Sequence, residues 1–198
     1  MAAGAAAALG EIRYASMAIV TLAYPRPAFA VPLAGSGYLV PAVDGRAVKA
    51  VTFSTVKWPH LLSAQRERRG GDGLHVVRCS VGRIGEEAIL QRDDAELAAL
   101  AAGEFAAATG VSGPPADARV TRWGGGLPQY SVGHLDRVAR IRASVAAQPG
   151  LAVCGAAYDG LGIPACIATA RTAADQVLKH LANHGGGHDG TTAADGGQ

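Results

Sequence analysis

The most informative stretch of the sequence is residues 151–178, LAVCGAAYDGLGIPACIATARTAADQVL. The short apolar run from Leu151 to Gly155 predicts a buried β-strand. A glycine-rich turn follows, and the spacing of apolar residues from about Pro164 to Asn183 predicts a helix, with proline suited to its first position because no N–H is needed there. The stretch therefore predicts the strand–turn–helix unit of an α/β fold.

Within the turn, Gly160, Gly162 and Ala165 fit the pattern G-x-G-x-x-A. The unpaired amides at a helix N-terminus can hold an anion or an electron-rich carbonyl, and small residues let a ligand approach the backbone closely. A complete dinucleotide fingerprint would need a second strand and an acidic residue about twenty positions on, and neither is present. An ordinary tight turn and a cofactor contact both remain open. Gly35 and Gly37 begin a second such pattern, but Pro41 follows it and argues against a nucleotide site.

Upstream of this stretch the pattern changes to a strand-rich region with fewer helices. The predicted strands are Ser16–Tyr24, Ala50–Trp58, Leu74–Val81 and Ala118–Trp123, and the predicted helices are Asp93–Thr109 and Leu135–Ala147. The charged, glycine-containing run Gln65–Gly73 predicts an exposed connection, with a basic patch for an anion as the alternative. The alanine-rich start predicts the end of a helix leading into Glu11, in a chain cut from something longer. Together these elements predict an α+β sheet region followed by the closing piece of an α/β unit.

Composition excludes several classes of protein. The 198 residues are 49% hydrophobic and 17% charged, with a net charge of +2, which is too small to predict nucleic-acid binding. No apolar run is long enough to predict a transmembrane span. The three cysteines, Cys79, Cys154 and Cys166, lack the spacing of a disulfide framework or zinc knuckle and favour a reducing cytoplasm.

A second cluster, WGGGLPQYSVGH, covers residues 123–134. Trp123 and Tyr130 offer flat apolar surface for a ring-shaped ligand, although the residues alone favour a core tryptophan beside a loop. His134 is a candidate acid or base, but no serine or cysteine nucleophile accompanies it. His180, His184 and His188 are spaced at four, yet the last two lie in the predicted glycine-rich tail, where no rigid site can form, so no metal site is predicted.

Several of these segments resemble one known family in the same order. LPQYSVGH and PGLAVCGAAYDGLGIPACIATARTAA resemble the C-terminal end of the FAD-dependent protoporphyrinogen/coproporphyrinogen III oxidases of the flavin amine oxidase superfamily. FAVPLAGSGYLVP and AVTFSTVKWPH resemble that family's G-x-G-Y-L-x-P and K-A-x-T-F-S-x-x-K-W segments. The resemblance runs from about Glu11 to Leu178, and its wording favours the coproporphyrinogen III branch.

The resemblance implies a cytoplasmic flavoenzyme of haem biosynthesis. FAD would remove hydride equivalents from a porphyrinogen, and O2 would reoxidise the flavin with release of hydrogen peroxide. Trp123 and the backbone at Gly155, Leu161, Gly162 and Ile163 would contact FAD, where helix amides stabilise negative charge on the reduced flavin. No catalytic residue is assigned among the protein's side chains, because the chemistry belongs mostly to the cofactor.

The same resemblance implies a division of the chain. Residues 1–14 would be a helix end and linker, 15–122 mainly a substrate-binding portion, 123–183 the closing segment of a Rossmann-like FAD-binding domain, and 184–198 a disordered tail. The family's N-terminal FAD-binding half has no match, which predicts a C-terminal fragment inactive without it. The alternatives are a non-catalytic remnant or interaction fragment, and a fragment of a flavin amine oxidase; the Y-L-x-P, K-W and P-Q-Y segments favour a porphyrinogen over an amine.

The sequence leaves the substrate's carboxylates without assigned partners. Five arginines are available to pair with propionates, although solvated loop positions are the default expectation: Arg66, Arg68, Arg69, Arg78 and Arg83.

Overall fold

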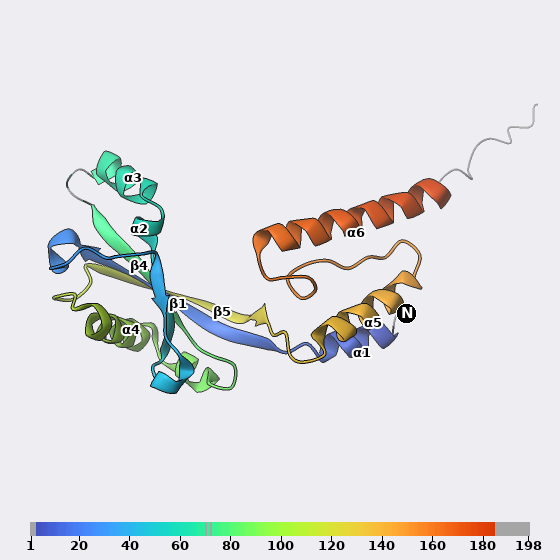
Figure 1. Ribbon diagram of the computed structural model, residues 1–198, viewed down its shortest axis with the longest axis horizontal. Coiled ribbons are helices and arrows are strands. Elements are labelled where there is room, and N and C mark those ends of the chain that lie inside the picture. The colour runs from blue at the N-terminus through green and yellow to red at the C-terminus, as the bar shows by residue number, and fades with distance from the viewer. Residues whose placement is uncertain (1–2, 70, 72, 185–198) are drawn as a thin grey trace, which may run out of the picture. The chain divides into compact units, whose positions relative to one another are not determined.

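The computed structural model describes residues 3–69, 71 and 73–184, and these form two compact units (Figure 1). Tyr14–Leu127 form the first, which we call the sheet unit. Residues 3–13 and 128–184 form the second, which we call the helical unit.

The sheet unit is built on a five-stranded antiparallel sheet in the order β2-β3-β4-β1-β5. Its strands are β1 (Tyr14–Pro25), β2 (Gly37–Leu39), β3 (Val48–Phe53), β4 (Leu74–Val81) and β5 (Asp117–Pro128). The predicted strands at residues 16–24 and 74–81 are confirmed. On the central strand Cys79 lies opposite Val20 of β1 and Val51 of β3, and all three are buried. Side chains alternate between the faces, so one face of the sheet forms the core.

Helix α4 (Asp94–Thr109) covers this face of the sheet, as Figure 1 shows. It buries Leu97, Ala101 and Phe105 at helical spacing, and the Phe105 ring lies 5.6 Å from that of Tyr24. Asp93 caps the helix by accepting from the Glu96 N–H, and the Glu96 side chain accepts from the Asp93 N–H. The acidic first turn and this reciprocal cap explain why the predicted helix forms where its pattern placed it.

Two charged side chains tie α4 to the sheet. Glu104 accepts hydrogen bonds from the backbone N–H groups of Ala47 (3.0 Å) and Val48 (2.9 Å) at the start of β3. Arg122 of β5 donates to the Leu90 carbonyl and to Asp94 in the first turn of α4, both at 2.6 Å. Both contacts satisfy groups at element ends, which lack partners within their own element.

The region between β3 and β4 differs from the prediction. The predicted strand at residues 50–58 ends at Phe53, and the short helix α2 (Ser54–Lys57) follows. The predicted exposed connection at 65–73 is wrong over its first part, which belongs to helix α3 (His60–Arg69). Pro59 precedes this helix, and glutamine, arginine and glutamate have high helix propensity. A charged run of this composition is therefore compatible with a helix as well as with a loop. Three 3-10 turns complete the unit: Arg26–Ala28, Ala42–Asp44 and Glu87–Gln91.

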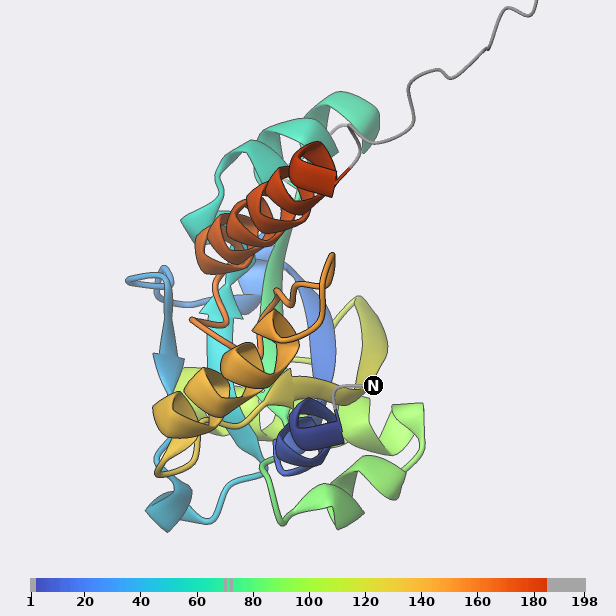
Figure 2. The same cartoon turned by 90° about the vertical axis from the view of Figure 1, so that its right-hand side faces the viewer.

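The helical unit contains α1 (Ala3–Gly10), α5 (His134–Ala146) and α6 (Ile163–His184). Helices α1 and α5 lie side by side in both views (Figures 1 and 2). Their small shared core includes Ala5, Ile12, Ile141 and Tyr158. The predicted helices at 135–147 and 164–183 are confirmed to within a residue at each end.

The predicted strand Leu151–Gly155 is wrong: the segment forms no ladder with any described residue. A strand exists only when its N–H and C=O groups pair with a neighbour, and the described elements beside this segment are helices. Helix α6 begins at Ile163, so Pro164 is its second residue. Strand β5 includes Trp123 and the glycines after it, beyond the predicted end. His184 still belongs to α6, and the rest of the predicted tail lies outside the described residues.

Candidate cofactor-binding site

The glycine-rich segment between residues 155 and 162 enters α6 through two glycines with positive φ. Gly155 has a φ of 119° and Gly160 a φ of 146°, a region that side-chain-bearing residues rarely adopt. A Cβ at Gly160 would lie 3.0 Å from the Cβ of Ala165, whereas a Cβ at Gly155 would meet nothing within 4 Å. Gly160 therefore allows close packing onto α6, and Gly155 leaves its backbone open to a ligand.

The first turn of α6 supplies backbone donors. The N–H of Cys166 bonds to the Gly162 carbonyl at 3.0 Å, whereas the N–H groups of Ile163 and Ala165, earlier in the helix, bond to no backbone carbonyl among the described residues. Leu161 is 46% exposed and Ile163 76% exposed, so solvent or a ligand reaches this turn. The geometry suits a carbonyl, or an anionic ring edge, lying against the helix N-terminus.

Two hydroxyl groups hold the turn that begins at Gly155. Thr169 Oγ1 accepts from the Gly155 N–H (3.1 Å) and donates to the Cys166 carbonyl (2.9 Å). The Tyr130 hydroxyl donates to the Ala156 carbonyl at 2.6 Å. Sequence reasoning missed Thr169, because a threonine inside a helix has no distinguishing signal in its neighbours.

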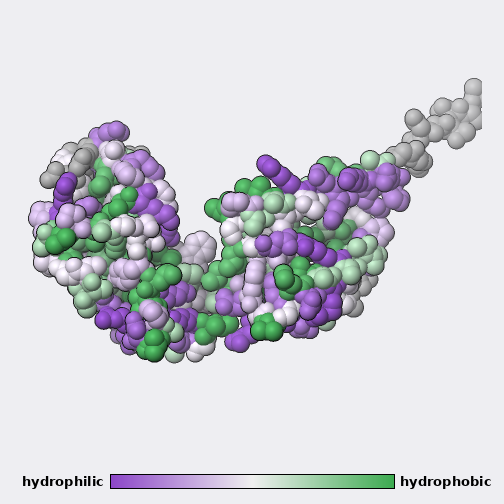
Figure 3. Space-filling model, in the orientation of Figure 1, coloured by the Kyte–Doolittle hydropathy of each residue, from purple (hydrophilic) through white to green (hydrophobic). Residues whose placement is uncertain are grey.

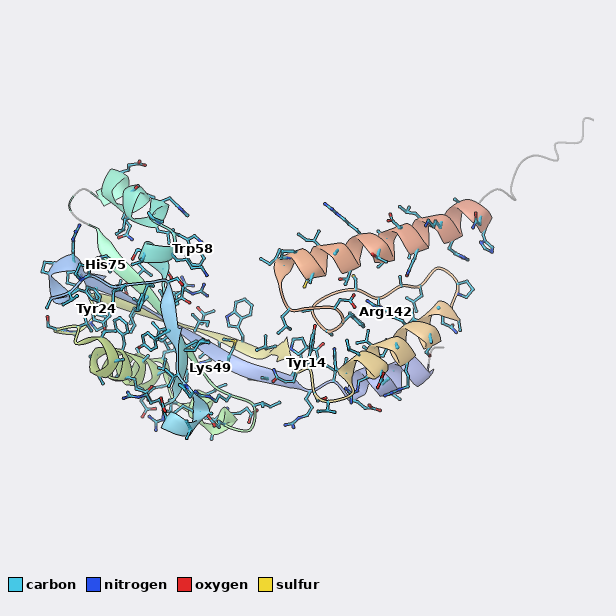
Figure 4. The ribbon with its side chains drawn as sticks, viewed as in Figure 1. Tyr14, Tyr24, Lys49, Trp58, His75 and Arg142 are labelled. Carbon is cyan, nitrogen blue, oxygen red and sulfur yellow. The ribbon has the colours of Figure 1, made fainter. Side chains whose placement is uncertain are left out.

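An ion pair closes the other end of this turn. Arg142 of α5 donates to Asp159 Oδ1 at 2.9 Å and also contacts Oδ2 (Figure 4). The hydrogen bond from Arg142 lowers the pKa of Asp159, and the same bond raises the pKa of Arg142. Beside the pair, α5, the segment from Gln148 to Val153 and α6 enclose a cavity of about 760 Å³.

The structure brings together four of the five predicted cofactor residues. Gly155, Leu161, Gly162 and Ile163 lie on one short segment of the helical unit, whereas Trp123 lies on β5 in the sheet unit and is 54% exposed. Their contact with a cofactor stays a prediction.

The histidines singled out in the sequence do not form a catalytic or metal-binding arrangement among the described residues. His134 is buried and stacks on Tyr130, with ring centroids 4.0 Å apart and planes 13° apart. His180 and His184 stack on each other, and His188 lies outside the described residues. In the described part of the chain, no three histidine, cysteine or acidic side chains gather as a metal site.

The face of the sheet turned away from α4 carries two arginines, and we call it the open sheet face. Arg78, on the central strand, lies opposite Thr21 and Thr52 and alternates with the buried Val77 and Cys79. Arg119 precedes Val120, which packs against the core, so its side chain lies on the open sheet face as well.

Both arginines are exposed, and neither forms an ion pair or hydrogen bond with the described residues. Asp117 shares this face at the start of β5. Arg83, by contrast, donates to the Arg46 and Val40 carbonyls, so it is already engaged.

Comparison with known proteins identifies the class. The profile of the family described as flavin containing amine oxidoreductase matches residues 2–178, and the chain belongs to this family. Among its relatives is a coproporphyrinogen III oxidase of Mycobacterium tuberculosis, 41% identical over 175 residues that cover 88% of this chain and 36% of that protein. A protoporphyrinogen oxidase of Bos taurus is 31% identical over 181 residues, covering 87% and 35%.

A solved structure agrees with these relatives. A crystal structure provisionally assigned as a protoporphyrinogen oxidase, from Exiguobacterium sp. 255-15, superposes with a TM-score of 0.70 at 30% identity and covers 86% of this chain. The chain spans about 36% of that structure's length, as it does of the mycobacterial relative's. The resemblance predicted from the ordered motifs is confirmed, including its partial extent.

Two further observations concern the environment of the protein. No helix among the described residues combines the length and hydropathy needed to cross a membrane. All three cysteines are described, and all three are free thiols.

Proposed function

We propose that this chain forms the closing part of an oxygen-dependent FAD oxidoreductase that converts coproporphyrinogen III to coproporphyrin III in cytoplasmic haem biosynthesis. The supporting observation is the 41% identity to the mycobacterial coproporphyrinogen III oxidase across 88% of this chain.

The residues present fit part of a flavin site. The open space beside Gly155 and the N–H groups of Ile163 and Ala165, which bond to no backbone carbonyl among the described residues, suit the edge of a flat ring with a carbonyl or developing negative charge. Leu161, Gly162 and Ile163 of the helical unit would hold this edge. Bound FAD would supply the hydride acceptor. The protein residues would orient it and stabilise charge on its edge.

The open sheet face supports a substrate with carboxylates. Arg78 and Arg119 are exposed guanidinium groups that form no ion pair with the described residues, and arginine recognises carboxylates through paired N–H donors. Between and around them lie half-buried neutral side chains such as Ile19, Thr21 and Val76, which suit an apolar macrocycle. We infer that propionates of the porphyrinogen pair with these two arginines.

A complete flavin site requires residues from outside these 198. The chain spans about a third of its relatives' length, and no segment among its described residues combines a strand, G-x-G-x-x-G and a helix to hold a pyrophosphate. We infer that the partner is the family's N-terminal FAD-binding part, and that the chain alone retains no stoichiometric flavin.

A graft tests this function directly. The chain replaces the 175 matching residues of the M. tuberculosis coproporphyrinogen III oxidase, and the purified graft is examined for flavin absorbance, porphyrin fluorescence and hydrogen peroxide. We expect bound FAD and oxidation of coproporphyrinogen III, with no flavin on the chain alone.

The other outcomes separate the alternatives. A folded, flavin-loaded graft that oxidises only protoporphyrinogen or an amine would reassign the substrate. A folded graft without flavin would indicate a non-catalytic remnant. Stoichiometric flavin on the chain alone would contradict its dependence on the remaining part.

A further inference from the structure

The dipeptide Gly155–Ala156 is held by two side chains, one from helix α6 and one from the loop before α5. Its first N–H donates to Thr169 Oγ1 of α6, and its last carbonyl accepts from the hydroxyl of Tyr130, which precedes α5. Thr169 is only 6% exposed, and it is the one buried side chain that α6 contributes among the described residues. No described strand pairs with this segment, so these two hydroxyls take over hydrogen bonds that a neighbouring strand would make.

A third side chain, that of His134, packs against the Tyr130 ring. His134 is 4% exposed and stacks on the Tyr130 ring, and neither of its ring nitrogens has a hydrogen-bond partner among the described residues. Burying unbonded polar atoms lowers stability, so such a group calls for an explanation. Gly133, with a φ of 79°, turns the chain so that residues 130 and 134 can stack.

We propose that Tyr130, His134 and Thr169 are positioning residues for the flavin-contacting turn. Thr169 and Tyr130 hold the Gly155–Ala156 backbone in the conformation that leaves it open to the flavin edge. His134 holds the Tyr130 ring, and with it the hydroxyl, in place. The role towards flavin rests on the proposed function, whereas the three contacts do not.

Amide hydrogen exchange, followed by NMR on the full chain, tests the contacts. Thr169→Val keeps the shape of the side chain but removes its hydroxyl, so exchange at the Gly155 amide is expected to rise about tenfold, the equivalent of one lost hydrogen bond. Thr169→Ser should restore the slow exchange. Thr172→Val is the matched control: Thr172 lies on the same helix and donates to the Ala168 carbonyl, but does not contact the turn.

Tyr130→Phe provides a second, independent variant that keeps the ring stack. It should raise exchange at residues 157 and 158. His134→Phe should preserve slow exchange, whereas His134→Ala should not. Unchanged exchange in folded Thr169→Val and Tyr130→Phe would overturn the proposal.

The effect of these residues on the flavin is measured in the graft, from the absorption spectrum and reduction potential of the bound flavin. Thr169→Val and Tyr130→Phe should shift both relative to the unmodified graft, and Thr169→Ser should reverse the shift. Exchange that rises without any change in the flavin would overturn the positioning role. A graft without flavin would contradict the proposed function, while the exchange experiment would still decide whether the hydroxyls hold the turn.

Discussion

His75 shows how a single half-buried side chain makes the stability of the sheet unit depend on pH. His75 lies on β4, opposite Tyr24 of β1 (Figure 4). Its Nδ1 is 3.3 Å from Thr55 Oγ1, and its ring packs edge-on against that of Phe29, with the ring centroids 5.2 Å apart. Burial, and then the charge of Arg26, lowers its pKa below the ordinary 6.5. The unfolded chain therefore takes up a proton near pH 6.5, while the folded chain resists protonation.

The free energy of unfolding should accordingly decrease as the pH falls below about 6.5, until the lowered pKa of the folded state is passed. Thermal unfolding at pH 7.5 and pH 5.5 measures this loss, and His75→Asn, which cannot titrate, should reduce it. His60→Asn, at an exposed position of the same unit, should leave the loss unchanged. An equal loss in wild type and His75→Asn would show that other groups are responsible.

Arg78 carries the corresponding prediction for the substrate. In the graft, Arg78→Gln should raise KM for coproporphyrinogen III about tenfold with a smaller change in kcat, because one charge-assisted contact to a propionate is lost. Arg92→Gln, at an exposed position of the same unit, is the matched control. The methyl ester of the substrate lacks the negative charge, so it should abolish the difference between wild type and Arg78→Gln. An unchanged KM in Arg78→Gln would contradict the pairing.

At the scale of elements, the stability of helix α4 depends on the cap at its N-terminus. Asp93→Ala removes the side-chain acceptor for the Glu96 N–H, and a lost helix cap costs about 1 kcal/mol. Urea unfolding of the full chain should show this decrease. Asp93→Asn should retain most of the stability, because asparagine caps equally well. A stable Asp93→Ala variant would mean that the buried face of α4 alone determines where the helix begins.

Elements whose signals are local were predictable from sequence. Helix α4 has a cap, an apolar face and a terminal glycine, and β4 has a β-branched run, so both were predicted closely. The segment 151–155 has an equally apolar run, but a strand also needs a partner, which sequence alone does not reveal. Helix α3 was missed because its charged run, followed by glycines, resembles a loop in sequence.

At the scale of the molecule, the candidate site was predictable only as far as one continuous segment reaches. The glycine turn and the start of α6 were placed together because they adjoin in sequence. The contacts of Thr169 and Tyr130 with that turn join residues 14 and 26 positions apart, and the pairing of Arg78 with Thr21 and Thr52 depends on strand register. Such contacts arise from tertiary packing, which the local pattern does not encode.

The outer surface of α6 provides the last prediction, for the chain as a whole. Apolar residues recur along it at alternating spacings of four and three: Ile163, Ile167, Ala170, Ala174, Val177 and Leu181. Ile167 is 48% exposed and Leu181 57% exposed, and hydrophobic surface is visible at the N-terminal end of the helix (Figure 3). An exposed stripe of this kind favours association, because contact removes apolar surface from water.

The isolated chain should therefore self-associate with increasing concentration, as sedimentation equilibrium would show. Ile167→Lys combined with Leu181→Lys should shift it towards monomer, because charge on the stripe opposes contact. Asp175→Lys changes the net charge by the same two units on the same helix, yet lies off the stripe, and should leave association unchanged. If Asp175→Lys dissociates the chain equally well, net charge rather than the apolar stripe controls association. A wild-type chain that stays monomeric at all concentrations would contradict the prediction outright.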